Sequence, residues 1–443
     1  MILSRRALRS LPFAAAILVV LFNPPAHATN IERVVSPGGI EAWLVHEPSV
    51  PLLAMEFAFA GGTTQDPAAK PGVANLAANL LDEGAGDLDS PTFHDRLERR
   101  AIDLGFSSSR DYLRGSVRTL SEHRNEAFDL LRLSLTQARF DSEPLERART
   151  QILSSLRRQT VSPNSIANQR FLAATFGTHP YGRPPDGTLD SVPKITADDL
   201  RAYTKHVLAR DHLKISVVGD IDKAELATLL DKIFGQLPAK AELVDVPDIT
   251  PQPAGERINI TLDVPQTTVV FGAPGVKRSD PDFMTSFVLN QIMAGGGVTS
   301  RLYREVREKR GLVYSISESL LWLNHAAMLV GYTATRTDRT NDTIDATMNE
   351  LKRMAEQGPT QAELDDAKAY LNGSQMLSLD TSAKIAGALL QYQLDGQPID
   401  YIDKRAGIIS AVTLDDAKRV AKKLWGQPFL TVAVGRIVQP TKD

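Results

Sequence analysis

The sequence of 443 residues contains no cysteine. This absence excludes disulfide bonds, thiolate nucleophiles and every metal site that depends on cysteine ligands. Charge of one sign does not dominate either, because 50 basic and 53 acidic side chains leave a formal net charge of −3. A balance of this kind gives no electrostatic footprint for nucleic acid, so we expect no nucleic-acid partner.

Histidine is scarce, and its spacing does not suggest metal binding. Beyond residue 28, no two histidines stand three or four positions apart, which is the spacing of a helical metal-binding pair. We expect structural or surface roles for these histidines, which are His46, His94, His123, His179, His206, His212 and His325.

Long apolar runs are missing after the first 28 residues. Within those residues, several arginines precede the apolar run Leu11–Phe22, and Ala26-His27-Ala28 follows as an A-x-A cleavage signal. This order predicts a secretory signal peptide over residues 1–28 and an exported mature protein, periplasmic or secreted, without a membrane span. Two alternatives stay open, namely an uncleaved amino-terminal anchor and export by the twin-arginine route.

The chain repeats one unit at long range, with an offset of 216 to 217 residues. Thr196 caps a predicted helix with acids in its first turn, and the strand Leu213–Val218 follows. Thr413 opens a helix of the same pattern, and the strand Phe429–Val434 follows. Earlier predicted strands match in the same order, at Leu53–Ala60 with Gln266–Ala273 and at Phe106–Ser109 with Leu312–Ser317.

Strands that are often adjacent in sequence, combined with long amphipathic helices, predict an α+β fold rather than a doubly wound parallel one. Each of two homologous halves should hold a mostly antiparallel or mixed sheet packed with helices. We predict an amino-terminal domain over residues 29–237, a proline-rich linker over 238–255 and a carboxy-terminal domain over 256–443. Halves joined in this way are expected to face each other across a cleft.

The second half carries a glycine run at residues 295–297, just before a predicted helix over residues 300–310. No Lys-Ser/Thr follows the run, so a flexible loop beside a cleft is favoured over a phosphate-binding loop. Arg307 lies in the predicted helix, and Tyr314 lies in the strand after it. By spacing alone, these are an ordinary helix-end cation and a half-buried strand aromatic.

These segments together resemble the pitrilysin/insulinase family of zinc metallopeptidases, which has the fold of the mitochondrial processing peptidases. The family's second-half signature is similar to residues 296–302 with Arg307 and residues 311–314, and it includes an arginine and a tyrosine seven residues apart. The His-Pro-Tyr-Gly run at residues 179–182 is similar to a further family segment. The resemblance implies that Arg307, Tyr314, Gly296 and Gly297 are substrate-binding residues.

Family members that cut peptides carry H-x-x-E-H on a first-half helix, with another glutamate about seventy-five residues later as the third zinc ligand. The corresponding positions here read Asn75, Ala78 and Asn79, and Ser155 stands where the later glutamate is expected. Asparagine amides are poor zinc ligands, and alanine cannot act as a base. We therefore predict a degenerate motif, with no metal site and no catalytic residue on this chain.

The resemblance implies a non-catalytic, substrate-binding subunit of a heterodimeric zinc metallopeptidase that acts on peptides. Zinc is expected in the partner, a homologue that carries H-x-x-E-H, and this chain would be inactive alone while supplying Arg307 and Tyr314. One alternative is a catalytically inactive peptide-binding or assembly protein of the same fold. Another is an independent enzyme that uses Asp82 or Glu83, although these acids fit a plain helix-end role.

Overall fold

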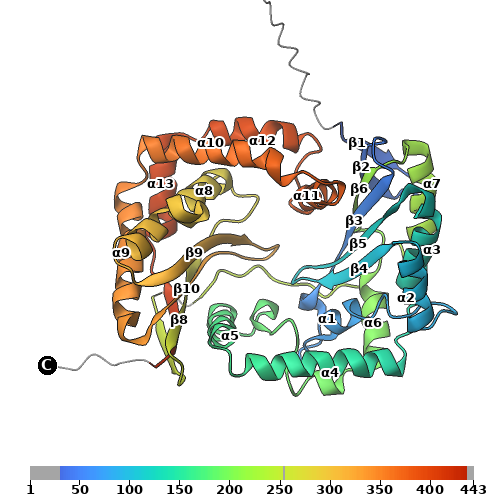
Figure 1. The fold of residues 1–443 in the computed structure, drawn as a ribbon, viewed down its shortest axis with the longest axis horizontal. Coiled ribbons are helices and arrows are strands. Elements are labelled where there is room, and N and C mark those ends of the chain that lie inside the picture. Colours follow the sequence, from blue (N-terminus) through green and yellow to red (C-terminus); the bar gives the residue numbers. More distant parts are fainter. Residues whose placement is uncertain (1–29, 253–254, 437–443) are drawn as a thin grey trace, which may run out of the picture.

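The computed structural model describes residues 30–252 and 255–436, so the predicted signal peptide lies outside the described residues. Two β-sheets stand at opposite ends of the molecule, with helices between and around them (Figure 1). The chain is therefore built from two α+β halves, as the sequence predicts. Within the described ranges, none of the helices has both the length and the apolar composition that crossing a bilayer requires.

The first sheet has six strands in the spatial order β1-β2-β6-β3-β5-β4. Neighbouring strands run antiparallel except β2 and β6, which are parallel. Because side chains alternate along a strand, β3 directs Met55 and Phe57 to one face of the sheet and Ala54 to the other. The bounds are β1 Glu32–Val35, β2 Glu41–His46, β3 Leu52–Ala60, β4 Asp103–Ser108, β5 Tyr112–Leu120 and β6 Lys214–Gly219.

The second sheet repeats this order without an equivalent of β1. Its order is β7-β11-β8-β10-β9, and β7 with β11 is again the parallel pair. The strand predicted from Leu312 extends further than expected, to Trp322. This correspondence confirms the mixed sheets and the duplicated unit. The bounds are β7 Arg257–Thr261, β8 Gln266–Pro274, β9 Val313–Trp322, β10 Ala327–Arg336 and β11 Leu430–Gly435.

Helices α3 and α7 cover one face of the first sheet, where Phe128 and Phe234 join the core around Phe57. The Thr196 side chain accepts a hydrogen bond from the N–H of Asp199 at the start of α6, which is the predicted cap. The helices of this half are α1 Val73–Ala78, α2 Ser90–Arg99, α3 Arg124–Thr136, α4 Ser142–Gln159, α5 Pro163–Phe176, α6 Ala197–Val207 and α7 Lys223–Phe234.

Helices α8, α9 and α13 form the corresponding layer on the second sheet, around Phe271 and Leu424. Thr413 caps α13 by accepting a hydrogen bond from the N–H of Asp416, as predicted. The helices of this half are α8 Phe283–Asn290, α9 Thr340–Gln357, α10 Gln361–Ser378, α11 Ser382–Leu394, α12 Tyr401–Ser410 and α13 Leu414–Trp425.

Each half sends one helix to the sheet of the other half (Figure 1). Phe171 of α5 packs over Gly272 of β8, where an added Cβ would stand 2.6 Å from the phenyl ring. In return, α11 covers the open face of the first sheet, and the Ser216 hydroxyl donates to the carbonyl of Ala386 (2.6 Å). This reciprocal exchange of helices buries the second apolar face of each sheet, so the two halves share their cores.

A buried polar cluster also joins the halves, and it uses the His-Pro-Tyr-Gly run. Tyr181 is fully buried, and its hydroxyl donates to Asp111 Oδ1 (2.6 Å) while accepting from the N–H of His325 (3.1 Å). The other carboxylate oxygen of Asp111 accepts from the N–H of Asn324 (3.1 Å). Because residues 324 and 325 form the turn between β9 and β10, this cluster fixes the second sheet against the first half.

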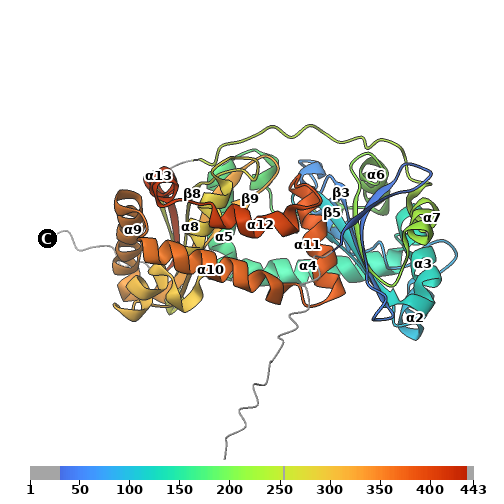
Figure 2. The ribbon, with the colours of Figure 1, turned by 90° about the horizontal axis from the view of Figure 1, so that it is seen from above.

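The segment between α7 and β7 runs along the outside of the molecule, and its described residues form no helix or strand (Figure 2). His179 accepts from the N–H of Tyr181 through Nδ1 (3.1 Å), so Nε2 donates to the carbonyl of Pro247 (2.9 Å). The N–H of Ile249 donates to the carbonyl of His325 (2.8 Å). The segment between α7 and β7 is therefore held at the same junction between the halves as the buried polar cluster.

Candidate functional site

The degenerate motif lies on a short, well-packed helix. The helix that carries these positions, α1, ends at Ala78, and Asn79 is its C-cap. Asp66 accepts hydrogen bonds from the N–H groups of Gly72 and Ala74 (2.7 Å each), which fixes the start of the helix. Burial raises the pKa of the Asp66 carboxyl to about 7, although both N–H donors oppose this shift.

The two asparagines of the motif contact each other. Asn79 Nδ2 donates to the main-chain oxygen of Asn75 (2.7 Å) and more weakly to its Oδ1 (3.2 Å). Ala78 is buried in the first-half core. The positions that would hold and activate a zinc-bound water therefore present two amides and a methyl group, which offer neither strong ligands nor a base.

The residues that follow α1 do not supply the metal ligands and the base that α1 lacks. Ser155 lies half-buried on α4, next to the core residue Leu156. Glu83 accepts from the Ser90 hydroxyl (2.5 Å) and pairs with Arg147 (2.6 Å), which are structural contacts at the turn after α1. Burial raises the pKa of Asp82 to about 6. Across residues 30–252 and 255–436, no three histidine, aspartate or glutamate side chains converge as metal ligands.

The structure brings Arg307 and Tyr314 together. The guanidinium carbon of Arg307 lies 5.3 Å from the centre of the Tyr314 ring and 4.4 Å from the centre of the Tyr303 ring. The Tyr314 side chain is 84% exposed, so its hydroxyl is available to a ligand. Sequence analysis missed Tyr303, although its position four residues before Arg307 places both on one side of a helix.

Arg307 differs from the basic residues around it in its partners. Four neighbours on the same segment are paired with Glu363 or Glu305, whereas Arg307 forms no ion pair within the described part of the chain. Its guanidinium is held by aromatic rings, which leaves its N–H donors available for an acceptor from outside. The paired neighbours are Arg301, Arg304, Lys309 and Arg310.

The segment that carries Arg307 is not the regular α-helix predicted over residues 300–310. Residues Tyr303–Glu308 form a π-helical turn, and a second π-helical turn, Gln291–Gly295, ends at the first residue of the glycine run. Such turns are rare in proteins, and those that occur are frequently found at functional sites. Gly297 is exposed with φ of +56°, a conformation that favours glycine, and Gly296 beside it is half-buried.

A buried ionic network holds this segment against α9 and α10. Arg301 binds Glu363 through two hydrogen bonds (2.6 and 2.8 Å) and donates to the carbonyl of Gly358 (3.0 Å). Burial alone would raise the pKa of Glu363, but the hydrogen bonds from Arg301 and from Thr360 hold it at about 2. The network therefore positions the turn from which Arg307 projects.

The site and the fold together define a class: a two-halved α+β fold in which the helix expected to carry metal ligands presents Asn75, Ala78 and Asn79, and an exposed arginine–tyrosine pair lies in the second half. The family model for insulinase (peptidase family M16) matches residues 43–188, and the model described as the peptidase M16 inactive domain matches residues 194–371. The chain belongs to the insulinase family, peptidase family M16.

Solved structures agree with this membership. The structure of a peptidase M16 inactive domain from Pseudomonas fluorescens superposes with a TM-score of 0.87 at 27% identity, covering 93% of this chain and 99% of that one. A protease from Helicobacter pylori has the same fold, with a TM-score of 0.84 at 18% identity over 92% of this chain and 99% of that one.

Relatives in sequence carry names of two kinds. A protein of Helicobacter pylori named non-peptidase homolog YmxG is 28% identical, over 80% of this chain and 81% of its own length. A Bacillus subtilis protein named uncharacterized zinc protease YmxG is 25% identical, over 90% of this chain and 97% of its own length. With two amides and a methyl group on α1 at the positions of the motif, this chain is an inactive member of the family.

Proposed function

We propose that this protein is the exported, non-catalytic subunit of a heterodimeric zinc metallopeptidase that acts on peptides in the periplasm or outside the cell. The partner is a homologue with an intact H-x-x-E-H motif, and it holds the zinc. This chain supplies Arg307 and Tyr314 to the zinc site of the partner. Gly296 and Gly297 contact the peptide in the same region.

One observation carries the proposal: the replaced motif on α1 coexists with an arginine–tyrosine pair that no carboxylate of the described residues engages. Within a single inactive chain, an unpaired arginine held between tyrosine rings has no catalytic use. Beside a zinc site on another chain, the same pair would face the peptide bond that the zinc-bound water attacks.

The chemistry of the pair suits that role. A guanidinium presents several N–H donors in a fixed plane and can bind a peptide carbonyl or a carboxylate in two places. A tyrosine hydroxyl can donate to the oxyanion that develops during hydrolysis. Both groups bind and orient the substrate, while water activation belongs to the partner's metal.

The test is a kinetic comparison of the purified heterodimer carrying Arg307→Ala, Tyr314→Phe or both. Losing one donor to an oxyanion typically lowers kcat by about a hundredfold to a thousandfold, so the double variant should lose at least about a hundredfold. Arg304→Ala is the matched control, because this exposed arginine of the same turn pairs with Glu363 instead (3.3 Å). Zinc content and complex mass should not change in any variant.

Full activity of the double variant would overturn the catalytic contribution of the pair. If no zinc-bearing homologue co-purifies with the chain from its native source, the proposed heterodimer is ruled out.

A second candidate function is an inactive peptide-binding or assembly protein, and the name of the Helicobacter pylori relative, non-peptidase homolog, favours it. Peptide binding by the lone chain that is insensitive to metal chelation, together with the absence of a zinc-bearing partner, would identify this second function.

A further inference from the structure

Two tyrosine rings flank the guanidinium of Arg307, and they come from different elements. The Tyr303 ring, four residues earlier on the π-helical turn, lies 4.4 Å from the guanidinium carbon, and the Tyr314 ring on β9 lies at 5.3 Å. Both distances are within the range of about 6 Å in which a ring face attracts a cation. Tyr303 is half-buried and Tyr314 is mostly exposed, so Tyr303 is the inner ring and Tyr314 the outer one.

A second arginine of this half, Arg278, also lies between two rings, and it shows a structural use of the arrangement. Its guanidinium carbon is 4.4 Å from the centre of the Phe283 ring and 5.2 Å from that of Tyr401, and both rings are buried. Its Nε also pairs with the carboxylate of Asp395 (3.3 Å). The charge of Arg278 is therefore neutralised inside a packed region.

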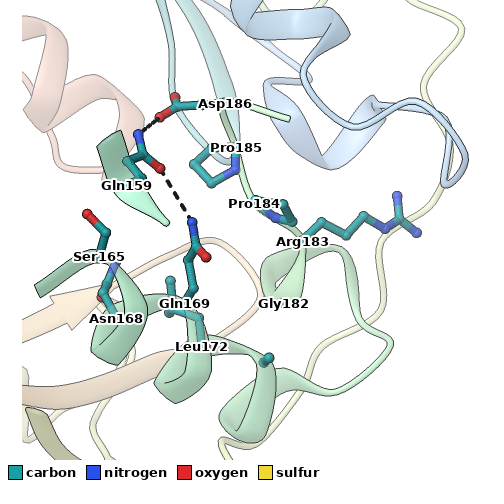
Figure 3. A pocket seen from close by; sticks show the side chains of 11 residues that line it. Gln159, Ser165, Asn168, Gln169, Leu172, Gly182, Arg183, Pro184, Pro185 and Asp186 are labelled. Atoms are coloured by element: carbon teal, nitrogen blue, oxygen red, sulfur yellow. Dashed lines mark hydrogen bonds between the residues drawn. The ribbon is translucent and has the colours of Figure 1, made fainter. Parts of the chain in front are cut away.

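Arg183 in the first half is held by a third kind of contact, a hydrogen bond to the main chain. It lines the cavity of Figure 3, where its side chain points away from the amides of Gln159 and Gln169. Its Nη1 donates to the carbonyl of Asp66 (3.0 Å). A contact of this kind fixes an arginine but occupies one of its donors.

Arg307 has the two rings but, among the described residues, no carboxylate. A ring face attracts the cation without taking up any of its N–H donors. Tyr303 itself lies outside the four apolar clusters of the described residues and outside the partly buried side chains packed on them. The Tyr303 ring therefore contributes little to the core, and its main contact is with the guanidinium.

The backbone that carries Tyr303 is firmly held. Leu302 and Val306, which flank it on the turn, are fully buried. The N–H of Lys309 donates to the carbonyl of Arg304, five residues earlier (3.0 Å), which closes the π-helical turn. The ring therefore has a fixed base from which it can hold the Arg307 side chain.

We infer that Tyr303 is a positioning residue of the substrate site: its ring orders the Arg307 guanidinium beside Tyr314 before a peptide binds. An arginine that is already ordered loses less conformational freedom when its donors meet a peptide carbonyl, so the peptide binds more strongly. Tyr303 acts through Arg307 and does not touch the peptide. The inference rests on the proposed function for its ligand, but the ordering of Arg307 is a property of the lone chain.

The first test measures this ordering in the lone chain with phenylglyoxal, a reagent that adds to the guanidinium nitrogens of accessible arginines. Peptide mass mapping follows the rate at Arg307 in the parent, Tyr303→Leu and Tyr303→Phe. Cation–π attraction at an exposed site corresponds to a factor of about two to five, so Tyr303→Leu should speed the reaction about threefold. Tyr303→Phe keeps the ring face and should react at nearly the parental rate.

Two other arginines are internal controls for this measurement. Arg304 lies on the same turn and pairs with Glu363, and Arg278 keeps its own rings and Asp395. Both should react at the parental rate in every variant. If Tyr303→Leu does not fold, Tyr303→Phe with increasing ring fluorination keeps the shape of the ring and weakens its negative face stepwise. The rate at Arg307 should then rise with each added fluorine.

An unchanged rate at Arg307 in Tyr303→Leu, or in the fluorinated series where that variant does not fold, would overturn the inference. An equal rise in Tyr303→Leu and Tyr303→Phe would overturn it too, because the hydroxyl rather than the ring face would then hold the guanidinium.

The second test uses the heterodimer and asks whether Tyr303 acts through Arg307. Tyr303→Leu should lower kcat/KM about threefold in the parent, and this loss should vanish when Arg307 is already alanine. An equal loss in both backgrounds would contradict the positioning role.

Failure of the proposed function would look different. If Arg307→Ala/Tyr314→Phe leaves the heterodimer fully active while Tyr303→Leu still speeds modification of Arg307 in the lone chain, the ordering of Arg307 stands and its part in substrate binding is removed.

Discussion

Glu318 is a carboxyl group buried inside the second half, on β9. Both of its oxygens accept from the indole N–H of Trp425 (3.1 and 3.2 Å), and the side chain is almost fully enclosed. Burial raises the pKa of this carboxyl to about 7, although the hydrogen bond from Trp425 opposes the shift. The group therefore carries its proton in the folded state at pH values where it is ionised in the unfolded chain.

This difference predicts how stability depends on pH. Between about pH 4.5 and pH 7 the folded state binds more protons than the unfolded state, so the contribution of Glu318 to the free energy of unfolding falls as pH rises. Glu318→Gln keeps an acceptor for Trp425 and removes the titration. Urea unfolding followed by circular dichroism at pH 5 and pH 8 should show a smaller pH dependence in the variant, by up to about 3 kcal/mol.

The other acids whose pKa is raised by burial, Glu56, Asp66, Asp82 and Glu350, are present in both proteins, so the comparison isolates Glu318. An equal pH dependence in parent and variant would show that this carboxyl is already ionised in the folded state.

Individual residues of the site were predictable to different degrees. The chemistry of the side chains alone decided the outcome for Asn75, Ala78 and Asn79. In no conformation can two amides and a methyl group bind zinc strongly and supply a base. The packing of Arg307 against both Tyr303 and Tyr314 could not be predicted, because Tyr314 reaches the guanidinium only through the π-helical turn and the start of β9. Sequence spacing does not reveal that geometry.

At the scale of elements, the network of Arg301 ties three segments together. Arg301 lies against Glu363 at the start of α10 and 3.7 Å from Glu350 on α9, and Glu350 is 3% exposed. Burial is the main cause that raises the pKa of Glu350, against the opposing effect of Arg353 and Arg301. Removing the arginine would leave two poorly hydrated carboxylates close together.

Arg301→Met is therefore expected to lower the free energy of unfolding by about 3–5 kcal/mol, the usual cost of breaking a buried ion pair on one side. Arg304→Met is the control, because its exposed pair with the same Glu363 should be worth about 1 kcal/mol or less. Urea unfolding of both variants at pH 7 measures the difference. Equal losses in the two variants would show that burial of the network has no energetic weight.

Helices with explicit start signals were predicted well, since Thr196 and Thr413 both cap the helices that the sequence assigns to them. The exchange of α5 and α11 was not predictable. A helix with apolar side chains on more than one side can pack on either sheet, and its sequence does not determine which of the two sheets it covers. That choice depends on the long-range fit of Phe171 over Gly272.

At the scale of the whole molecule, the exchanged helices couple the stability of the halves. The first half alone, residues 30–237, would expose the α5 face that contains Phe171 and the sheet face that contains Val218. The second half alone would lose the cover on β8 and β11. Apolar faces of this size are unstable in water.

We therefore expect residues 30–237 and residues 256–436, expressed separately, to be unfolded or aggregated. Co-expressed, they should form a one-to-one complex with the circular dichroism of the intact chain, as measured by size-exclusion chromatography with light scattering. As a control, intact protein cut at a protease site inserted beside the exposed Lys240 should stay associated. Two soluble, folded, monomeric halves would contradict this account.

The shared cores also explain how a protein of this fold can be retained after its catalytic activity is lost. Deleting either half removes the helix that shields the sheet of its neighbour, so selection for a folded product preserves the full length of the gene. Substitutions at residues 75, 78 and 79 leave every one of those cross-half contacts in place. A protein of this fold can therefore lose its catalytic residues through a few substitutions while both halves and the contacts between them are retained.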